Sequence, residues 1–198
     1  MGSALIDDVV IIDNVVNTEI QESLEKICVS DGFGWIFNPV TAYSEHHIKE
    51  HGIPESFLEN SVDTPLFTHL LWSDYGRNSH YFNNFVPILD AIPNINHLHR
   101  VKVNLTLPHK DVTPETRSFP HVDYRNVDRD FTTGIYYINN SDGDTYIFNE
   151  YFDHTGPLTV KQRITPKRGR LILFNGKLLH SGNNPTQGVR LIANINFT

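Results

Sequence analysis

The stretch SFPHVDYRN places two good ligands for a divalent metal, His121 and Asp123, one residue apart. In an extended chain, residues i and i+2 point to the same side, so both side chains can reach one ion. A third ligand of suitable type, His180, lies in KLLHSG, directly after the strand-like segment RLILFNG. Two imidazoles and one carboxylate on one face of an octahedron form the facial triad of non-haem Fe(II) sites. We therefore predict that His121, Asp123 and His180 bind a metal and carry the chemistry; the alternative is a polar network without a metal.

Ten residues after His180, Arg190 begins the strand-like segment RLIANINF. Alternation along a strand puts Arg190, Ile192, Asn194 and Asn196 on one mainly polar face, which would line a cavity. It puts Leu191, Ala193, Ile195 and Phe197 on the other face, in the core. A buried arginine needs an anionic partner, and no acidic residue neighbours Arg190 in the sequence. A dicarboxylic cosubstrate can supply that partner through a bidentate contact with the guanidinium. The two asparagines either contact this cosubstrate or form hydrogen bonds within the protein.

The elements that must position these residues change character near residue 100. Residues 1–99 mix expected helices at 17–28, 64–72 and 79–92 with a strand at 4–16. The last helix is expected to be interrupted at Pro87 or to begin late there. Residues 100–198 read as short strands separated by turn signals such as NNSDGD, HTGP and TPKRG. This pattern predicts a mainly β fold, a jelly-roll with the N-terminal helices packed on the outer face of one sheet. We expect one domain over residues 1–198.

Two polar segments of the first half contain further candidate functional residues. Residues 38–64 show little periodicity and are expected to form a long loop, with a substrate lid as the sharper alternative. His97 and His99, in HLHR, also have the spacing of metal ligands. No third ligand follows them at a suitable place in the sequence, so we expect surface or loop histidines.

Net charge, cysteine count and the lengths of the apolar runs disfavour several classes of function. The net charge is −7 and the sequence pI is near 5.8, which disfavours a nucleic-acid partner. Cys28 is the only cysteine, so no internal disulfide and no cysteine-based metal cluster can form. No apolar run is long enough to span a membrane and no signal peptide is visible, so we expect a cytoplasmic protein. The oligomeric state is not indicated.

Together these segments resemble the Fe(II)/2-oxoglutarate-dependent dioxygenases, and within them the prolyl 4-hydroxylase-like branch. The resemblance rests on HVD at 121–123, FTTGIYYIN at 131–139, ITPKRGRLILFNGKLLHSG at 164–182 and GVRLIANINF at 188–197. It implies a double-stranded β-helix core with His121, Asp123 and His180 as iron ligands. Arg190 is then the residue that binds the distal carboxylate of 2-oxoglutarate.

The resemblance also implies further cosubstrate contacts. Tyr137 matches a tyrosine that assists this carboxylate, with a packed strand residue as the alternative, and Thr133 lies on the same strand face. Asn194 and Asn104 are further candidates, the latter on a strand where the family often carries a tyrosine. The single glycine in SDGDTYIF departs from the glycine pair frequent in the family. The implied cofactor and cosubstrates are Fe(II), 2-oxoglutarate and O₂, with ascorbate as an additional candidate.

By this resemblance the expected activity is hydroxylation of a C–H bond, best matched by a prolyl residue in a peptide or protein, with a small-molecule substrate also open. Two alternatives remain. One is an oxidative nucleic-acid demethylase of the same chemistry, which usually carries extra arginines after the distal histidine, whereas only Arg190 follows His180 here. The other is a non-catalytic β-barrel binding protein that contains a metal.

Overall fold

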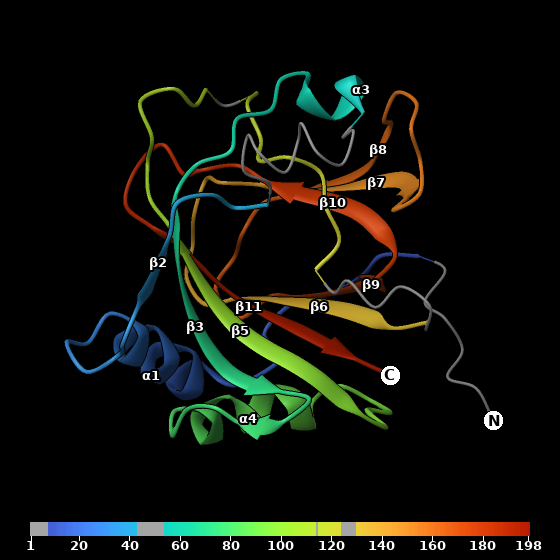
Figure 1. Ribbon diagram of the computed structural model, residues 1–198. Helices are drawn as coiled ribbons and strands as arrows, with labels where there is room; N and C mark the ends of the chain where they lie inside the picture. The colour runs from blue at the N-terminus through green and yellow to red at the C-terminus, as the bar shows by residue number, and fades with distance from the viewer. Residues whose placement is uncertain (1–7, 43–53, 114, 124–129) are drawn as a thin grey trace.

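The structure is a computed structural model that describes residues 8–42, 54–113, 115–123 and 130–198. The described residues form two antiparallel β-sheets that face each other, with helices outside the larger one (Figure 1). The larger sheet has the strand order β1-β9-β6-β11-β5-β3-β2, and β4 pairs with β3. Its strands are β1 (Val10–Ile12), β9 (Leu171–Asn175), β6 (Thr132–Tyr137), β11 (Arg190–Phe197), β5 (Leu98–Thr106), β3 (Leu66–Ser73), β2 (Ile36–Asn38) and β4 (Gly76–Arg77).

The smaller sheet has the order β10-β7-β8, formed by Leu178–Gly182, Thr145–Tyr151 and Val160–Ile164. The segment 118–121 extends this sheet beyond β10. The backbone N–H of Ser118 donates to the carbonyl of Gly182 over 2.8 Å, and the N–H groups of His121 and His180 each donate to the other's carbonyl over 3.0 Å. These bonds bring the two predicted metal-binding segments side by side.

Helix α1 (Thr18–Cys28) and helix α4 (Phe82–Asp90) cover the outer face of the larger sheet (Figure 1). Leu24 and Cys28 of α1 and Phe85 and Ile88 of α4 are buried in one core with the outward residues of β5, β6 and β11. Burying one such leucine contributes roughly 1.5–3 kcal/mol relative to leaving it in water. The short helix α3 (Glu55–Leu58) lies at the smaller sheet, where Phe57 packs with Tyr146, Phe148 and Leu179.

Between the two sheets lies a second apolar cluster, which contains Ile135 and Tyr137 of β6 and Ile192 of β11. Strand β11 therefore separates its side chains as the alternation predicts. Leu191, Ala193, Ile195 and Phe197 lie in the helix-covered core, whereas Arg190, Ile192 and Asn194 line a pocket between the sheets. The predicted double-stranded β-helix with helices on the outer face of one sheet is confirmed.

Some local predictions were wrong. Residues 66–73 form strand β3 instead of the helix expected at 64–72. A short apolar run fits either structure, and here pairing decides, because β3 is hydrogen-bonded between β2 and β5. The expected strand at 4–16 is shorter, since only Val10–Ile12 pair with β9 and residues 1–7 lie outside the described part. No helix among the described residues is long and apolar enough to cross a membrane.

Candidate metal centre and cosubstrate pocket

The backbone bridge between His121 and His180 sets their imidazoles against each other, with ring centroids 4.9 Å apart. His121 Nδ1 lies 2.8 Å from the carbonyl oxygen of Phe119, and His180 Nδ1 lies 3.3 Å from that of Leu178. A carbonyl only accepts, so Nδ1 of each ring carries the proton. In both rings Nε2 then keeps its lone pair, which is the atom that a metal needs.

The Asp123 side chain, at the end of the segment 118–123, approaches the two imidazoles. Its Oδ1 accepts a hydrogen bond of 2.8 Å from Asn194 Nδ2, and Arg100 Nη2 lies 3.2 Å from the same oxygen. Asn194 lies on β11 and Arg100 on β5, so two strands of the larger sheet orient this carboxylate. The other oxygen, Oδ2, lies 3.5 Å from His180 Nε2.

Asp123, His121 and His180 each offer one ligand atom, and these atoms all lie within 4.8 Å of one another. Asp123 Oδ2 and His180 Nε2 are buried and have no hydrogen-bond partner among the described residues. A buried polar atom without a partner costs about 1–3 kcal/mol, more when charged. A divalent cation would satisfy both atoms at once, so the donor set fits a metal, and its two imidazoles and one carboxylate match the facial triad.

The protonation states of His121 and Asp123 also favour metal binding. Burial, together with the neighbouring His180, lowers the pKa of His121 to about 4, so its imidazole is neutral near neutral pH. Burial acts to raise the pKa of Asp123, but the positive charge of Arg100, together with the adjacent histidines, outweighs it and holds that pKa well below the usual range. A neutral imidazole and an ionised carboxylate are the ligand forms that bind a divalent ion.

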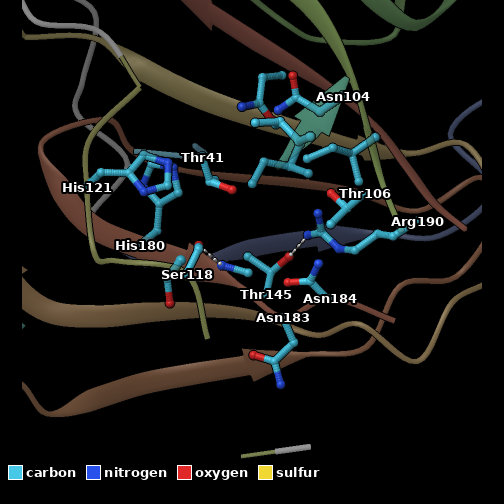
Figure 2. A pocket seen from close by; sticks show the side chains of 16 residues that line it. Thr41, Asn104, Thr106, Ser118, His121, Thr145, His180, Asn183, Asn184 and Arg190 are labelled. Atoms are coloured by element: carbon cyan, nitrogen blue, oxygen red, sulfur yellow. Dashed lines mark hydrogen bonds between the residues drawn. The ribbon is translucent and has the colours of Figure 1, made fainter. Parts of the chain in front are cut away.

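The pocket beside this centre is walled mainly by polar side chains. Figure 2 shows the two imidazoles at one end and the Arg190 guanidinium at the other. The empty space among these side chains is about 490 Å³, counting the part open to solvent. The lining residues are Thr41, Leu66, Asn104, Thr106, Ser118, His121, Ile135, Thr145, His180, Ser181, Gly182, Asn183, Asn184, Arg190, Ile192 and Asn194.

Arg190 is buried and held by neutral acceptors. Its Nε donates to the carbonyl of Gly143 over 2.7 Å, and its Nη2 donates to Thr145 Oγ1 over 2.7 Å. No acidic side chain of the described part of the chain forms an ion pair with it. The guanidinium has five N–H donors, so two bonds leave donors available to a bound anion. A carboxylate in this pocket would provide the negative charge that a buried guanidinium requires.

Thr145, on β7, is a pocket residue that the sequence did not single out. Its Oγ1 accepts from Arg190 Nη2 and also from the Tyr137 hydroxyl, over 2.8 Å. Tyr137 is fully buried and is not itself among the lining residues, so it reaches the pocket through Thr145. The signal available in the sequence was its place at the start of the strand after the turn SDGD.

The single glycine of that turn lies where the chain passes closest to Arg190. A Cβ at Gly143 would approach the carbonyl oxygen of Asn183 to 2.6 Å and Arg190 Cδ to 2.9 Å. Both distances are shorter than a normal van der Waals contact. Glycine at this position therefore lets the backbone carbonyl of residue 143 reach the guanidinium.

The remaining predicted cosubstrate residues are placed differently. Asn104 and Asn194 line the pocket, and their amide oxygens are buried without a hydrogen-bond partner among the described residues. Thr133 is buried and is not among the lining residues, and its hydroxyl accepts from Asn196 Nδ2 over 3.1 Å. A direct contact of Thr133 with a cosubstrate stays a prediction.

Two segments of the first half of the chain, residues 38–64 and His97–His99, also bear on candidate sites. The expected loop at 38–64 is only partly described, because residues 43–53 lie outside the described part. Its described ends flank the pocket, with Thr41 in the lining and bonded to the carbonyl of Thr64. The expectation that His97 and His99 lack a third ligand was wrong, because Asp74 of the β3–β4 turn joins them. Asp74 precedes them in the chain, and only the pairing of β3 with β5 brings it close.

Comparison with known proteins agrees with this geometry. A family model described as the 2OG-Fe(II) oxygenase superfamily matches residues 97–198, just over half of the chain. No curated protein sequence matches the chain.

Solved structures share the fold at low identity. The non-haem α-ketoglutarate-dependent epimerase SnoN from nogalamycin biosynthesis is 10% identical with a TM-score of 0.60, over 96% of this chain and 78% of that one. A Pseudomonas putida prolyl-4-hydroxylase is 12% identical with a TM-score of 0.55, over 96% and 91%. A Trichoplax adhaerens prolyl hydroxylase, in complex with a hypoxia-inducible-factor peptide, is 15% identical with a TM-score of 0.54, over 96% and 83%.

The family match includes all three residues of the metal centre and Arg190. The chain therefore belongs to the 2OG-Fe(II) oxygenase superfamily.

Proposed function

We propose that this protein is an Fe(II)- and 2-oxoglutarate-dependent dioxygenase that hydroxylates a C–H bond, with a prolyl residue of a peptide or protein as the first substrate class to test. One observation carries the proposal: a buried His-Asp-His centre shares one pocket with a buried arginine that has no acidic partner among the described residues. The superfamily implies Fe(II), 2-oxoglutarate and O₂ at this centre.

The balance of the proposed reaction is simple. Substrate C–H, 2-oxoglutarate and O₂ give substrate C–OH, succinate and CO₂, so one oxygen atom enters the product and one enters succinate. The bound iron supplies the activation of O₂ that this oxidation needs. His121 Nε2, His180 Nε2 and Asp123 Oδ2 are the atoms that would hold the iron.

The chain's own residues orient these ligands before a metal binds. The carbonyls of Phe119 and Leu178 fix the tautomer of the two imidazoles. Asn194 and Arg100 hold Oδ1 of Asp123, which directs Oδ2 towards the rings. Outer partners of this kind typically change metal affinity 10–100-fold when they are removed.

Arg190 selects the cosubstrate by charge and shape. Its guanidinium faces the pocket opposite the imidazoles, so a dicarboxylate can lie between the metal and the arginine (Figure 2). Charge-assisted bonds to the distal carboxylate offset the desolvation of both groups. A monocarboxylic 2-oxo acid would leave Arg190 without this partner and is expected to bind more weakly.

The first assay measures succinate formed from 2-oxoglutarate with Fe(II), with and without ascorbate. The native chain should consume 2-oxoglutarate and the Asp123→Ala variant should not. Asp111→Ala is a suitable control, because Asp111 is an exposed carboxylate outside the pocket. If the native chain and Asp123→Ala convert 2-oxoglutarate at the same measurable rate, the proposed centre is wrong. If neither protein converts it, a non-catalytic metal-binding barrel becomes the better description.

The second assay identifies the substrate class. The protein, supplied with Fe(II) and 2-oxoglutarate, is incubated with proline-containing peptides, with a panel of small molecules or with a panel of methylated oligonucleotides. The masses of the products are measured by mass spectrometry. A gain of one oxygen atom on a peptide supports prolyl-type hydroxylation. Loss of methyl groups from an oligonucleotide would support a demethylase instead. Oxidation of 2-oxoglutarate with no change in substrate mass would point to epimerisation, the activity stated for the structural neighbour SnoN.

A further inference from the structure

A second cluster of metal-ligand residues lies away from the pocket, at the start of β5. Asp74 occupies the two-residue turn of the β3–β4 hairpin, where Ser73 pairs with Gly76. His97 and His99 lie two residues apart in the chain, and His99 belongs to β5. Each of the three residues offers a ligand atom, and these atoms all lie within 4.8 Å of one another.

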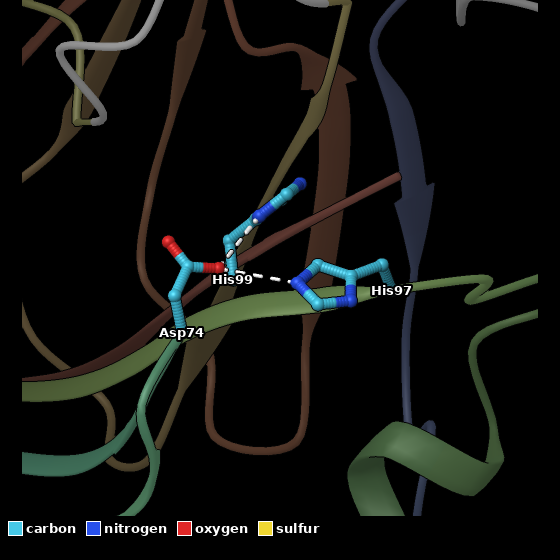
Figure 3. A group of neighbouring side chains, drawn as sticks. All are labelled: Asp74, His97 and His99. Carbon is cyan, nitrogen blue, oxygen red and sulfur yellow. Dashed lines mark hydrogen bonds and ion pairs between the residues drawn. The ribbon is translucent and has the colours of Figure 1, made fainter.

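The contacts converge on a single atom (Figure 3). His97 Nε2 lies 3.2 Å from Asp74 Oδ1, and His99 Nδ1 lies 3.0 Å from the same oxygen. In a tetrahedral zinc site with metal–ligand bonds of about 2.0–2.2 Å, two ligand atoms lie roughly 3.3–3.5 Å apart. The observed separations differ from that value by only a few tenths of an ångström, so a small movement of exposed side chains would admit an ion.

This cluster is separate from the His-Asp-His centre. Side chains alternate along β5, so His99 shares its face with Val101 and Val103, which lie in the helix-covered core. Arg100, on the other face, reaches Asp123. The two candidate sites are therefore on opposite faces of the larger sheet, and a variant of His97 leaves the pocket residues in place.

The backbone around the cluster is held by contacts independent of the three side chains. The Trp72 indole N–H donates to the carbonyl of Leu98 over 3.0 Å, which ties β3 to the start of β5. The N–H of His97 donates to Thr198, and the N–H of Thr198 donates back to His97, over 2.8 and 2.9 Å. A site on a pre-ordered backbone loses less conformational entropy when an ion binds.

Exposure decides which side of an ion would be open. The His99 side chain is 7% exposed, whereas Asp74 and His97 are 38% and 58% exposed. An ion held here would have protein on one side and water on the other. Two imidazoles, one carboxylate and one water form a tetrahedral N₂O₂ set, which suits Zn(II).

We propose that Asp74, His97 and His99 form a second metal site that binds Zn(II) and ties the β3–β4 hairpin to the start of β5. On binding, each imidazole carries its proton on the nitrogen that faces away from the ion, and the two N–H···O contacts to Asp74 are replaced by bonds to the metal. The site has one open position for water and does not depend on the proposed oxygenase activity.

Metal stoichiometry tests the proposal. Metal-free protein is dialysed against Zn(II), and bound zinc is measured for the native chain, for His97→Ala, for His121→Ala/His180→Ala and for the variant with all three changes. We expect two, one, one and no ions. Since losing an outer partner already costs 10–100-fold in affinity, losing His97 should weaken this site by at least about 10-fold.

His109→Ala is the matched control. His109 is also near a carboxylate, Asp111 at 3.7 Å, but the described residues provide no second imidazole there. The control should keep both ions, and His97→Ala should keep the 2-oxoglutarate turnover of the native chain while binding one ion fewer.

Co(II) provides a second readout, because tetrahedral cobalt absorbs visible light more strongly than octahedral cobalt. The His121→Ala/His180→Ala protein should show the tetrahedral spectrum, and the additional change of His97 should remove it. If the triad variant does not fold, the comparison of native chain with His97→Ala still decides. Equal zinc content in those two proteins, or an equal loss in His109→Ala, would overturn the proposal.

Discussion

Replacing Thr145 by valine removes a hydroxyl oxygen on which two buried donors converge. Arg190 Nη2 and the Tyr137 hydroxyl both donate to Thr145 Oγ1, over 2.7 and 2.8 Å. Valine has nearly the same shape, so packing changes little. Each donor left unsatisfied costs about 1–3 kcal/mol. Thr145→Val should therefore lower the free energy of unfolding by roughly 2–6 kcal/mol, a large part of the 5–15 kcal/mol typical of a domain.

A double-mutant cycle separates this cause from ordinary packing loss. Tyr137→Phe alone removes one hydrogen bond and should cost about 1 kcal/mol. In the Thr145→Val background the tyrosine hydroxyl has already lost its acceptor, so removing it should restore about 1–3 kcal/mol. The double variant is then more stable than Thr145→Val, although two polar groups have been removed.

Urea unfolding of the metal-free protein, followed by the fluorescence of Trp35 and Trp72, measures all four free energies. Thr106→Val is the control, because Thr106 lines the same pocket and its hydroxyl makes no hydrogen bond with the described residues. This variant should be nearly neutral. If Thr145→Val is also neutral, or if the effects of Thr145→Val and Tyr137→Phe add, the two donors do not share the hydroxyl.

Three further predictions concern Asn194, which orients a metal ligand, the buried Cys28, and the surface residue Asp13. Asn194→Ala removes the donor to Asp123 Oδ1 and should weaken Fe(II) binding about 10–100-fold, measured by anaerobic titration, with the fold unchanged by circular dichroism. Cys28 is buried, which raises its pKa to about 12, so only about one thiol in ten thousand is ionised at pH 8; alkylation should be slow until the protein unfolds. Hydrogen bonds from Arg170 and Lys167 lower the pKa of Asp13 from 3.8 to about 2, so its stabilisation is present above pH 3.8 and lost as the pH falls towards 2. Asp13→Asn should therefore destabilise at pH 7, by at most about 1 kcal/mol for this exposed pair, and the difference should shrink on acidification; a pH-independent difference would contradict this.

Sequence alone was sufficient for the features that depend on residue type and short-range periodicity. His121, Asp123 and His180 are the residue types that bind iron, and the spacing of the first two places them on one side of an extended chain. Alternation from Arg190 to Phe197 separated the core residues from Arg190, Ile192 and Asn194, which line the pocket. Asn196 shares their face but does not line the pocket, because it is hydrogen-bonded to Thr133 and Arg100. The strand pattern after residue 100 indicated the two-sheet fold, since a two-residue period and turn residues are local properties.

Tertiary structure decided which partner each polar group has, because partners come from strands far apart in the chain. The hydrogen bond from Asn194 to Asp123 depends on strand pairing that no local sequence pattern specifies. The same holds for Thr145 Oγ1, which accepts from both Arg190 and Tyr137. Residues 66–73 illustrate the same limit: their apolar run fits a helix or a strand, and the hydrogen bonds offered by β5 select the strand. That pairing also brings Asp74 to His99, so a carboxylate that the sequence left apart from the histidines becomes their neighbour.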